Sequence, residues 1–308
     1  MTTTVSRPAS RSESARRRPQ KNGPKRPPRH LRLHLLLAGI ALLWLVPLLW
    51  AVYTSLRSYE DTSANGYFSW PRSFSLENFT NAWTQSGMPH FFWNSVLITV
   101  PAVLGTLLFS AAVAFFVSRF DFRFNLALLM LFTAGNLLPA QVLITPLYRL
   151  YLLVPLPWWM SDSMLLYDSM WGIIAIHIAY QCGFCTFVLS NYMKTIPKEI
   201  TEAAQVDGAP VWRQFFQIIL PLCRPAFAAL ATLESIWIYN DFFWPLILVD
   251  TGDKRPITSA LANLQGAYFT NPNLIAAGAL MTAIPTLLVY FALQRQFISG
   301  LTIGSSKG

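Results

Sequence analysis

The chain has 308 residues, of which 54% are hydrophobic and only 12% are charged. Because soluble domains carry about 25% charged residues, this composition excludes an ordinary soluble protein and indicates a membrane protein. The net charge of +9 is confined to the first 32 residues, which excludes a basic nucleic-acid-binding domain in the remainder.

The first segment, residues 1–32, holds ten basic residues and the single acid Glu13. It is rich in Arg, Pro and Ser, so we expect a disordered tail. It is too long and too basic for a simple secretory signal, and no small-residue cleavage site follows the first apolar run. Two roles stay open for it, namely binding of anionic lipid and a signal for topology alone.

Six later stretches are long and apolar enough to cross a bilayer, which takes about 20 residues. The third is the least uniform, because Asn136, Pro139, Gln141 and Pro146 interrupt it. The sequence therefore predicts an all-α membrane protein with a six-helix domain over 33–295 and a short C-terminal tail over 296–308. The expected spans are residues 33–56, 91–118, 124–149, 170–193, 223–249 and 273–295.

Basic residues predict the orientation of these spans. With the N-terminus inside, 18 Lys and Arg residues lie on the inner side and five on the outer side. The positive-inside rule therefore favours a plasma (inner) membrane protein with both termini in the cytoplasm. The outer segments are then about 57–90, 150–169 and 250–272, and each contains Trp or Tyr, as expected near an interface.

One inner segment, residues 197–221, is not a span. Pro197 suits a first helical turn, and Glu199 and Glu202 follow near that N-terminus, where negative charge is favoured. Gly208 fits the position after a helix end, and a second helix can run from Pro210 to about Pro221. This predicts a helix, a glycine bend and a helix. An apolar stripe is expected on the second helix at Trp212, Phe215, Phe216 and Ile219.

Three interpretations of this segment compete. The first is a plain surface loop, and the second is an interfacial anchor, which favours Lys and Arg rather than Glu202 and Asp207. The third is a rigid element that docks on a soluble partner. The residues alone leave the first and third interpretations about level.

A family resemblance favours docking. The segment resembles the "EAA" loop of ABC-importer permeases: Glu-Ala-Ala, three residues, Gly, nine residues, then Ile-x-Leu-Pro ending at Pro221. The resemblance implies a coupling helix that binds a cleft of a separate ATPase subunit. The residues that it would place at this dock are Glu202, Ala203, Ala204, Asp207, Gly208 and Trp212.

Further stretches are similar to the maltose-type (MalG-like) branch of that family. They are "QRQFISGLTIGSSKG" at the C-terminus, "IYNDFFWPLIL" over 238–248, and the shorter "SLENFTNAW" and "WNSVLITV". The resemblance covers about residues 33–308. It implies a second permease subunit, two ATPase subunits and an external solute-binding protein as partners. A C-terminal tail between the ATPases would include Gly300, Gly304, Lys307 and Gly308.

The chain itself lacks an energy source. A phosphate-binding P-loop needs Gly-Lys followed by Ser or Thr, and the dipeptide Gly-Lys does not occur. We therefore expect no enzyme activity and no cofactor on this chain, with ATP and Mg on the partner ATPase. Cys182 and Cys185 form a C-x-x-C with only His177 nearby, so we expect small buried residues and no metal site.

Polar residues within spans are expensive and tend to face a pathway or a neighbouring helix. Glu234 lies seven residues before Asp241, so both are expected near one helical face. The alternative is that Glu234 pairs with a neighbouring helix. The predicted solute pathway comprises Glu234, Trp237, Tyr239, Asn240 and Asp241, whose acids, amides and rings suit a carbohydrate.

Together these features predict the permease subunit of an ATP-driven importer for a sugar or oligosaccharide. A non-sugar small solute is the alternative within the family. A self-sufficient channel or secondary transporter is the alternative outside it, although no inverted repeat is evident in the sequence. A membrane-embedded enzyme would need a catalytic set, and no convincing one is present.

Overall fold

The computed structural model describes residues 31–85, 87–136, 138–264 and 270–302. Within these ranges the chain is helical and has no strand, apart from isolated bridges such as the one between Pro155 and Leu165. The chain divides into two compact units, Met1–Leu48 and Leu49–Gly308. The all-α prediction is thus confirmed for the described residues.

Helix α1 (Leu31–Ser55) begins in the first unit. Its sequence is almost wholly apolar, and the part described in the first unit exposes large hydrophobic side chains on all sides. A helix that is apolar all round is expected in lipid or against another apolar protein surface. It corresponds to the expected first span.

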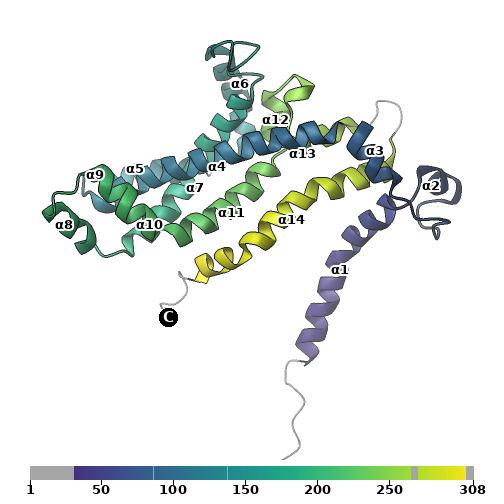
Figure 1. Cartoon of the computed structure of the whole chain (residues 1–308), viewed down its shortest axis with the longest axis horizontal. Helices are drawn as coiled ribbons and strands as arrows, with labels where there is room; N and C mark the ends of the chain where they lie inside the picture. The colour runs from purple at the N-terminus through teal and green to yellow at the C-terminus, as the bar shows by residue number, and fades with distance from the viewer. Residues whose placement is uncertain (1–30, 86, 137, 265–269, 303–308) are drawn as a thin grey trace, which may run out of the picture. The chain divides into compact units, whose positions relative to one another are not determined.

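The second unit contains the other helices (Figure 1). The long ones are α4 (Met88–Arg119), α7 (Met170–Lys194), α11 (Arg224–Tyr239) and α14 (Pro272–Thr302). The shorter α-helices are α2 (Tyr59–Asn65), α3 (Glu77–Gln85), α5 (Asn125–Gly135), α6 (Ile144–Leu153), α8 (Glu199–Val206), α9 (Val211–Arg213), α10 (Leu220–Leu222), α12 (Phe243–Leu248) and α13 (Ile257–Ala260). Brief 3-10 or π turns are η1 (Ala140–Leu143), η2 (Gln214–Ile219), η3 (Gly252–Lys254) and η4 (Leu261–Leu264).

Two expected spans are broken rather than continuous. Four described helices are long and apolar enough to cross a membrane. The number rises to six if two bent pairs each form one span, and the second of these pairs joins Val211–Leu222 to Arg224–Tyr239 rather than α11 to α12. In the third expected span, α5 and the helix after Pro139 meet at 92°. In the fifth, α11 ends at Tyr239 and α12 is separate, so a single helix over 223–249 is wrong. At Pro139 the reason is the missing backbone N–H and the steric limit on the preceding residue.

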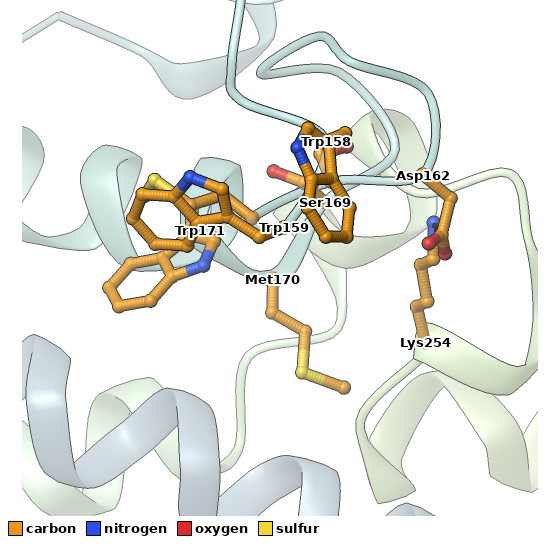
Figure 2. A pocket seen from close by; sticks show the side chains of 9 residues that line it. Trp158, Trp159, Asp162, Ser169, Met170, Trp171 and Lys254 are labelled. Carbon is orange, nitrogen blue, oxygen red and sulfur yellow. Dashed lines mark ion pairs between the residues drawn. The ribbon is translucent and has the colours of Figure 1, made fainter.

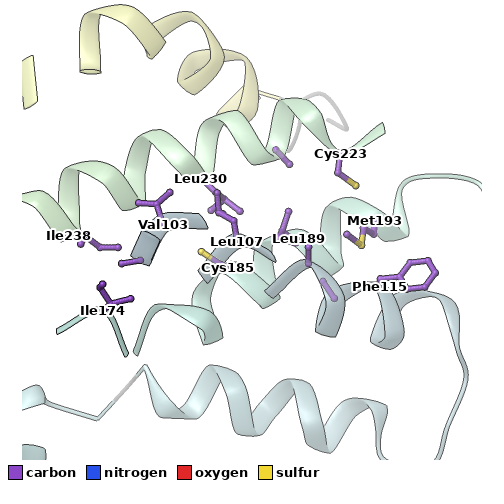
Figure 3. Packing of buried hydrophobic residues seen from close by; sticks show 14 of the residues in the cluster. Val103, Leu107, Phe115, Ile174, Cys185, Leu189, Met193, Cys223, Leu230 and Ile238 are labelled. Atoms are coloured by element: carbon purple, nitrogen blue, oxygen red, sulfur yellow. The ribbon is translucent and has the colours of Figure 1, made fainter. Parts of the chain in front are cut away.

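The core of the second unit lies where α4, α7 and α11 pack together (Figure 3). Leu107 and Phe115 from α4 meet Leu189 from α7 and Leu230 from α11, and all four are buried. Close approach requires small residues at some crossings. At Gly183 on α7, an added Cβ would lie 2.1 Å from the backbone oxygen of Phe132 on α5.

A buried arginine organises the chain that follows α1. Arg57 is only 1% exposed, and its Nε donates to Asp61 Oδ2 at 2.7 Å while Nη2 donates to Ser69 Oγ at 2.6 Å. The side-chain amides of Asn78 and Asn273 donate to the carbonyl of Arg57 at 2.7 and 3.0 Å. The end of α1, α2, α3 and the start of α14 are therefore joined through one polar cluster.

The Gly183 contact gives a stability prediction. Gly183→Ala forces α5 and α7 apart, and we expect a loss of about 1–3 kcal/mol, typical of overpacking. Gly135→Ala is the matched control, because nothing lies within 4 Å of a Cβ added there. Thermal unfolding of the full chain in detergent measures both variants, and equal midpoints would contradict this packing.

The Arg57 cluster gives a pH prediction. The hydrogen bond from Arg57 holds the pKa of Asp61 below its ordinary value. Because the pKa of Asp61 is lower in the folded chain than its ordinary value near 3.8, the Arg57–Asp61 pair stabilises the fold fully above that ordinary value. This stabilisation is lost as the pH falls through the pKa of Asp61 in the folded chain. Amide-exchange protection of α2 should therefore fall in that acid window.

Asp61→Asn should weaken that protection at neutral pH and remove its acid dependence. The control is Glu60→Gln, which changes an exposed neighbouring acid. If Asp61→Asn and Glu60→Gln give the same exchange profile as the unmodified chain, the Arg57–Asp61 pair does not order α2.

Candidate partner-docking site

Residues 199–222 form the helix, bend and helix that the sequence predicts. Helix α8 is followed by Gly208, whose φ of +76° lies in the left-handed region that favours glycine. The second arm runs through α9, η2 and α10 and meets α11 at 75°. In Figure 1 this segment, drawn in green, lies at the same end of the second unit as the start of α11.

Backbone hydrogen bonds fix the bend on both sides. Asp207 N donates to Ala203 O at 3.0 Å, and Ala209 N donates to Ala204 O at 2.9 Å. From the second arm, the buried side chain of Gln214 donates from Nε2 to Ala209 O at 2.8 Å. The two arms are therefore held in one geometry by groups on both of them.

The second arm ends at Leu222, in agreement with the expected end near Pro221. The expected single apolar stripe is wrong. Phe215 and Ile219 are buried, whereas Trp212 and Phe216 are 56% and 53% exposed.

The π geometry of η2 explains this division of the stripe. A π turn takes more residues than an α turn, so residues four apart align on one face. This separates the pair Trp212 and Phe216 from the pair Phe215 and Ile219. One pair of side chains packs into the core, and the other pair is left facing outward. The sequence pattern assumes ordinary α-helical spacing throughout, so it could not separate them.

The exposed residues of the segment form a mixed surface, which we call the docking surface. Five of the six residues that the resemblance nominates are exposed, and Ala204, only 8% exposed, packs inward instead. Two apolar residues that the sequence reasoning missed add to this surface, namely Val206, 88% exposed, and Phe216. The docking surface comprises Glu202, Ala203, Val206, Asp207, Gly208, Trp212 and Phe216.

The base of the segment is tied to α4 and α7. Arg119, the last residue of α4, donates from Nη2 to Met193 O and from Nη1 to Ile196 O, both at 3.0 Å. These bonds satisfy carbonyls at the C-terminus of α7, which helices otherwise leave unpaired. The chain that leads into α8 is therefore bonded to the end of α4.

The polar residues of the fifth expected span do not lie on one continuous helix. Because α11 ends at Tyr239, Asp241 lies beyond it, and its carboxylate accepts from Phe243 N and Trp244 N at the start of α12. Glu234 is fully buried, and Cys185 Sγ on α7 donates to its Oε1 at 3.2 Å. Glu234 therefore contacts a neighbouring helix, as the alternative interpretation expected.

The remaining members of that set differ in accessibility. Tyr239 is buried, whereas Trp237 is 42% exposed. Asn240 is also exposed, and its side chain donates to Ile236 O at 2.8 Å and to Thr286 Oγ1 on α14 at 3.2 Å. His177 Nε2 lies 3.5 Å from Asp241 Oδ2. In the chain by itself, only Trp237 and Asn240 of the five are well exposed.

The three cysteines are free and buried. Across the described ranges, no group of three or more His, Cys, Asp or Glu residues is placed to hold a metal ion. Of the predicted tail residues, Gly300 lies within α14, which continues past residue 295 to Thr302. Gly304, Lys307 and Gly308 lie outside the described residues.

At the other end of α7, Asp168 joins two loops. It has a φ of +57°, and its Oδ1 accepts from Asp250 N at 2.9 Å and from Thr251 N at 2.8 Å. Lys254 Nζ lies 3.4 Å from Asp168 Oδ2. Burial acts to raise the pKa of Asp168, but hydrogen bonds from Thr251 and the charge of Lys254 outweigh it and hold that pKa below its ordinary value.

A pocket of about 200 Å³ lies beside this junction (Figure 2). Trp158, Trp159 and Trp171 contribute its aromatic lining, and Lys254 pairs with Asp162 at 3.2 Å on the opposite side. These loops belong to two of the expected outer segments. The hydrogen bonds of Asp168 hold the two loops together, and the loops carry aromatic and charged side chains.

Comparisons with known proteins identify the family. Residues 106–301 match the model of the binding-protein-dependent transport system inner membrane component. The diacetylchitobiose uptake system permease protein NgcG of Streptomyces coelicolor is 30% identical over 89% of this chain and 88% of its own. The arabinooligosaccharides transport system permease protein AraQ of Halalkalibacterium halodurans is 31% identical over 88% of this chain and 94% of its own.

The fold has a solved counterpart. A chain from the crystal structure of a bacterial ABC transporter involved in the import of the acidic polysaccharide alginate superimposes with a TM-score of 0.72. It is 21% identical and covers 86% of this chain and 95% of its own. The family resemblance seen in the sequence is thereby confirmed. The chain belongs to the binding-protein-dependent transport system inner membrane components, and is the multi-pass permease part of an ABC importer rather than its ATPase.

Proposed function

We propose that this permease moves a sugar or oligosaccharide and receives its energy through the docking surface. The observation that carries this proposal is the bend at Gly208, which presents exposed apolar side chains beside acidic ones. The saccharides in the names of the relatives support the choice of solute. A non-sugar small solute is the alternative within the same family.

The composition of the docking surface favours a protein partner over a lipid surface. Trp212 and Phe216 provide the exposed aromatic area that is enriched at protein interfaces. Glu202 and Asp207 are exposed beside them, and such acids repel anionic membrane lipids. We place an ATPase subunit here, in agreement with the family resemblance.

The geometry supports transmission of force from this surface into the helices. The Gln214–Ala209 hydrogen bond holds the arms together, and Cys223 alone separates α10 from α11. Closure of an ATPase dimer would move the docking surface as a unit, and α11 would follow it. The proposed assembly has a second permease subunit, two ATPase subunits and an external binding protein, with both termini of this chain cytoplasmic.

We assign the external partner to the loops joined by Asp168. Two non-glycine residues with positive φ, Met164 and Asp168, lie in the loop before α7, and such backbone strain concentrates at functional sites. The tryptophans of the adjoining pocket are exposed and suit an interface core. A binding protein docked there would release solute toward α11.

Gly208 provides the sharpest test of docking. Gly208→Val places a β-branched residue at positive φ, which destabilises the observed bend by roughly 1–2 kcal/mol. The population of this bend relative to other backbone geometries then falls about tenfold. We expect solute uptake by membrane vesicles to fall by a similar factor while ATP hydrolysis continues uncoupled. Gly208→Asn is the matched control, because Asn tolerates this conformation and no atom crowds its Cβ. Unchanged uptake by Gly208→Val would refute the docking role.

The solute pathway has its own test. We propose that Trp237 and Asn240 contact the solute, and that Glu234, Tyr239 and Asp241 support them from more buried positions. Trp237→Ala and Asn240→Ala should each raise the half-saturating solute concentration several-fold at an unchanged amount of membrane protein. Trp44→Ala on α1, where the indole is 80% exposed, is the control. If all three variants behave alike, the pathway lies elsewhere.

A further inference from the structure

A second pocket lies at the opposite end of α7, and neither solute transfer nor ATPase docking uses it. It has a volume of about 350 Å³ and is bounded by the end of α4, the start of α5 and the end of α7. Val117, Leu126 and Leu129 give it an apolar wall, and Lys194 and Lys198 give it a cationic rim. An apolar wall next to a cationic rim suits an amphipathic anion.

The two lysines are available to a ligand. Lys194 is exposed and makes no hydrogen bond or ion pair within the described part of the chain. Lys198 Nζ lies 3.3 Å from Asp121 Oδ2, but both side chains are well exposed, and such surface pairs are weak. Arg119 is not available, because it caps the carbonyls at the end of α7.

One wall of the pocket also offers an unused acceptor. Asn125 donates from Nδ2 to Phe120 O at 2.6 Å, and its Oδ1 is buried without a partner. A buried acceptor left unpaired is costly, so a shift of the Asn125 side chain toward a ligand's hydroxyl or ammonium donor would be favoured. Asn125 also begins α5, whose N-terminal end carries partial positive charge.

The surroundings of the pocket indicate that such a ligand comes from the membrane. Both α4 and α7 are candidate spans, and the pocket lies at their polar ends. Beside it, Phe122, Phe124 and Leu126 are 42%, 65% and 64% exposed. Apolar side chains exposed next to a basic rim are typical of the boundary between head groups and acyl chains.

We propose that this pocket binds the head group of an anionic glycerophospholipid. Lys194 and Lys198 contact the phosphate, Asn125 Oδ1 accepts from the head group's donor, and an acyl chain lies along Val117, Leu126 and Leu129. Because Lys198 directly precedes α8, the lipid occupies the base of the docking segment. This inference depends on α4 and α7 being spans and stands whether or not an ATPase docks on α8.

The test uses the full chain in nanodiscs with a photoreactive phosphatidylglycerol and peptide mapping of the cross-links. We expect cross-links in residues 117–129 and 194–198, competed by phosphatidylglycerol but not by phosphatidylcholine. Lys194→Gln and Lys198→Gln should each lower the labelling roughly fivefold, which is about 1 kcal/mol per basic residue near the surface.

The matched control is the double variant Arg213→Gln and Arg224→Gln, which removes two exposed basic residues that do not line the pocket. Labelling that falls as much in this double variant as in the two lysine variants would mean general surface attraction and would overturn the proposal. If soluble glycerol phosphate competes as strongly as the lipid does, the proposal that the ligand comes from the membrane is overturned. Labelling that maps elsewhere on the chain would overturn the site.

Discussion

The left-handed backbone at Gly208 is the constraint on which the proposed coupling geometry depends. A non-glycine residue there is strained, and the adjoining hydrogen bonds of Ala209 leave little room for another path. With the bend fixed, α8 and the second arm present one surface and lead without a flexible linker into α11. A chain with no P-loop motif thus has a rigid point at which a partner's motion can enter.

The rest of the fold supports the bent segment 199–222 by close packing and by buried polar contacts. Gly183 allows α5 to approach α7, and Arg119 ties α4 to the end of α7. At the other end of α7, Asp168 joins the two loops that carry the tryptophan pocket. Contiguous contacts along α7 and α11 therefore link the proposed docking surface with the opposite loops.

The spans and the bent segment were largely predictable from the sequence, because the signals that start, stop and extend helices are local. Apolar length indicated the spans, and Pro197, Gly208 and Pro210 indicated the helix, bend and helix. The break after Tyr239 and the π turn at η2 were not predictable, because both depend on packing rather than on local pattern. For the same reason the sequence could not decide between a pathway and a neighbouring helix for Glu234, which contacts Cys185 on α7. Nor could it tell that Phe216 is the exposed member of the pair Phe215 and Phe216.

Cross-linking from a single introduced cysteine tests the central claim most directly. The native cysteines are buried, so Val206→Cys places the one accessible described thiol on the docking surface. With a thiol-to-amine cross-linker in native membranes, we predict a product that contains the ATPase subunit, and none from Trp158→Cys in the opposite loop. A Val206→Cys chain that reacts fully with maleimide but never joins the ATPase would contradict the account.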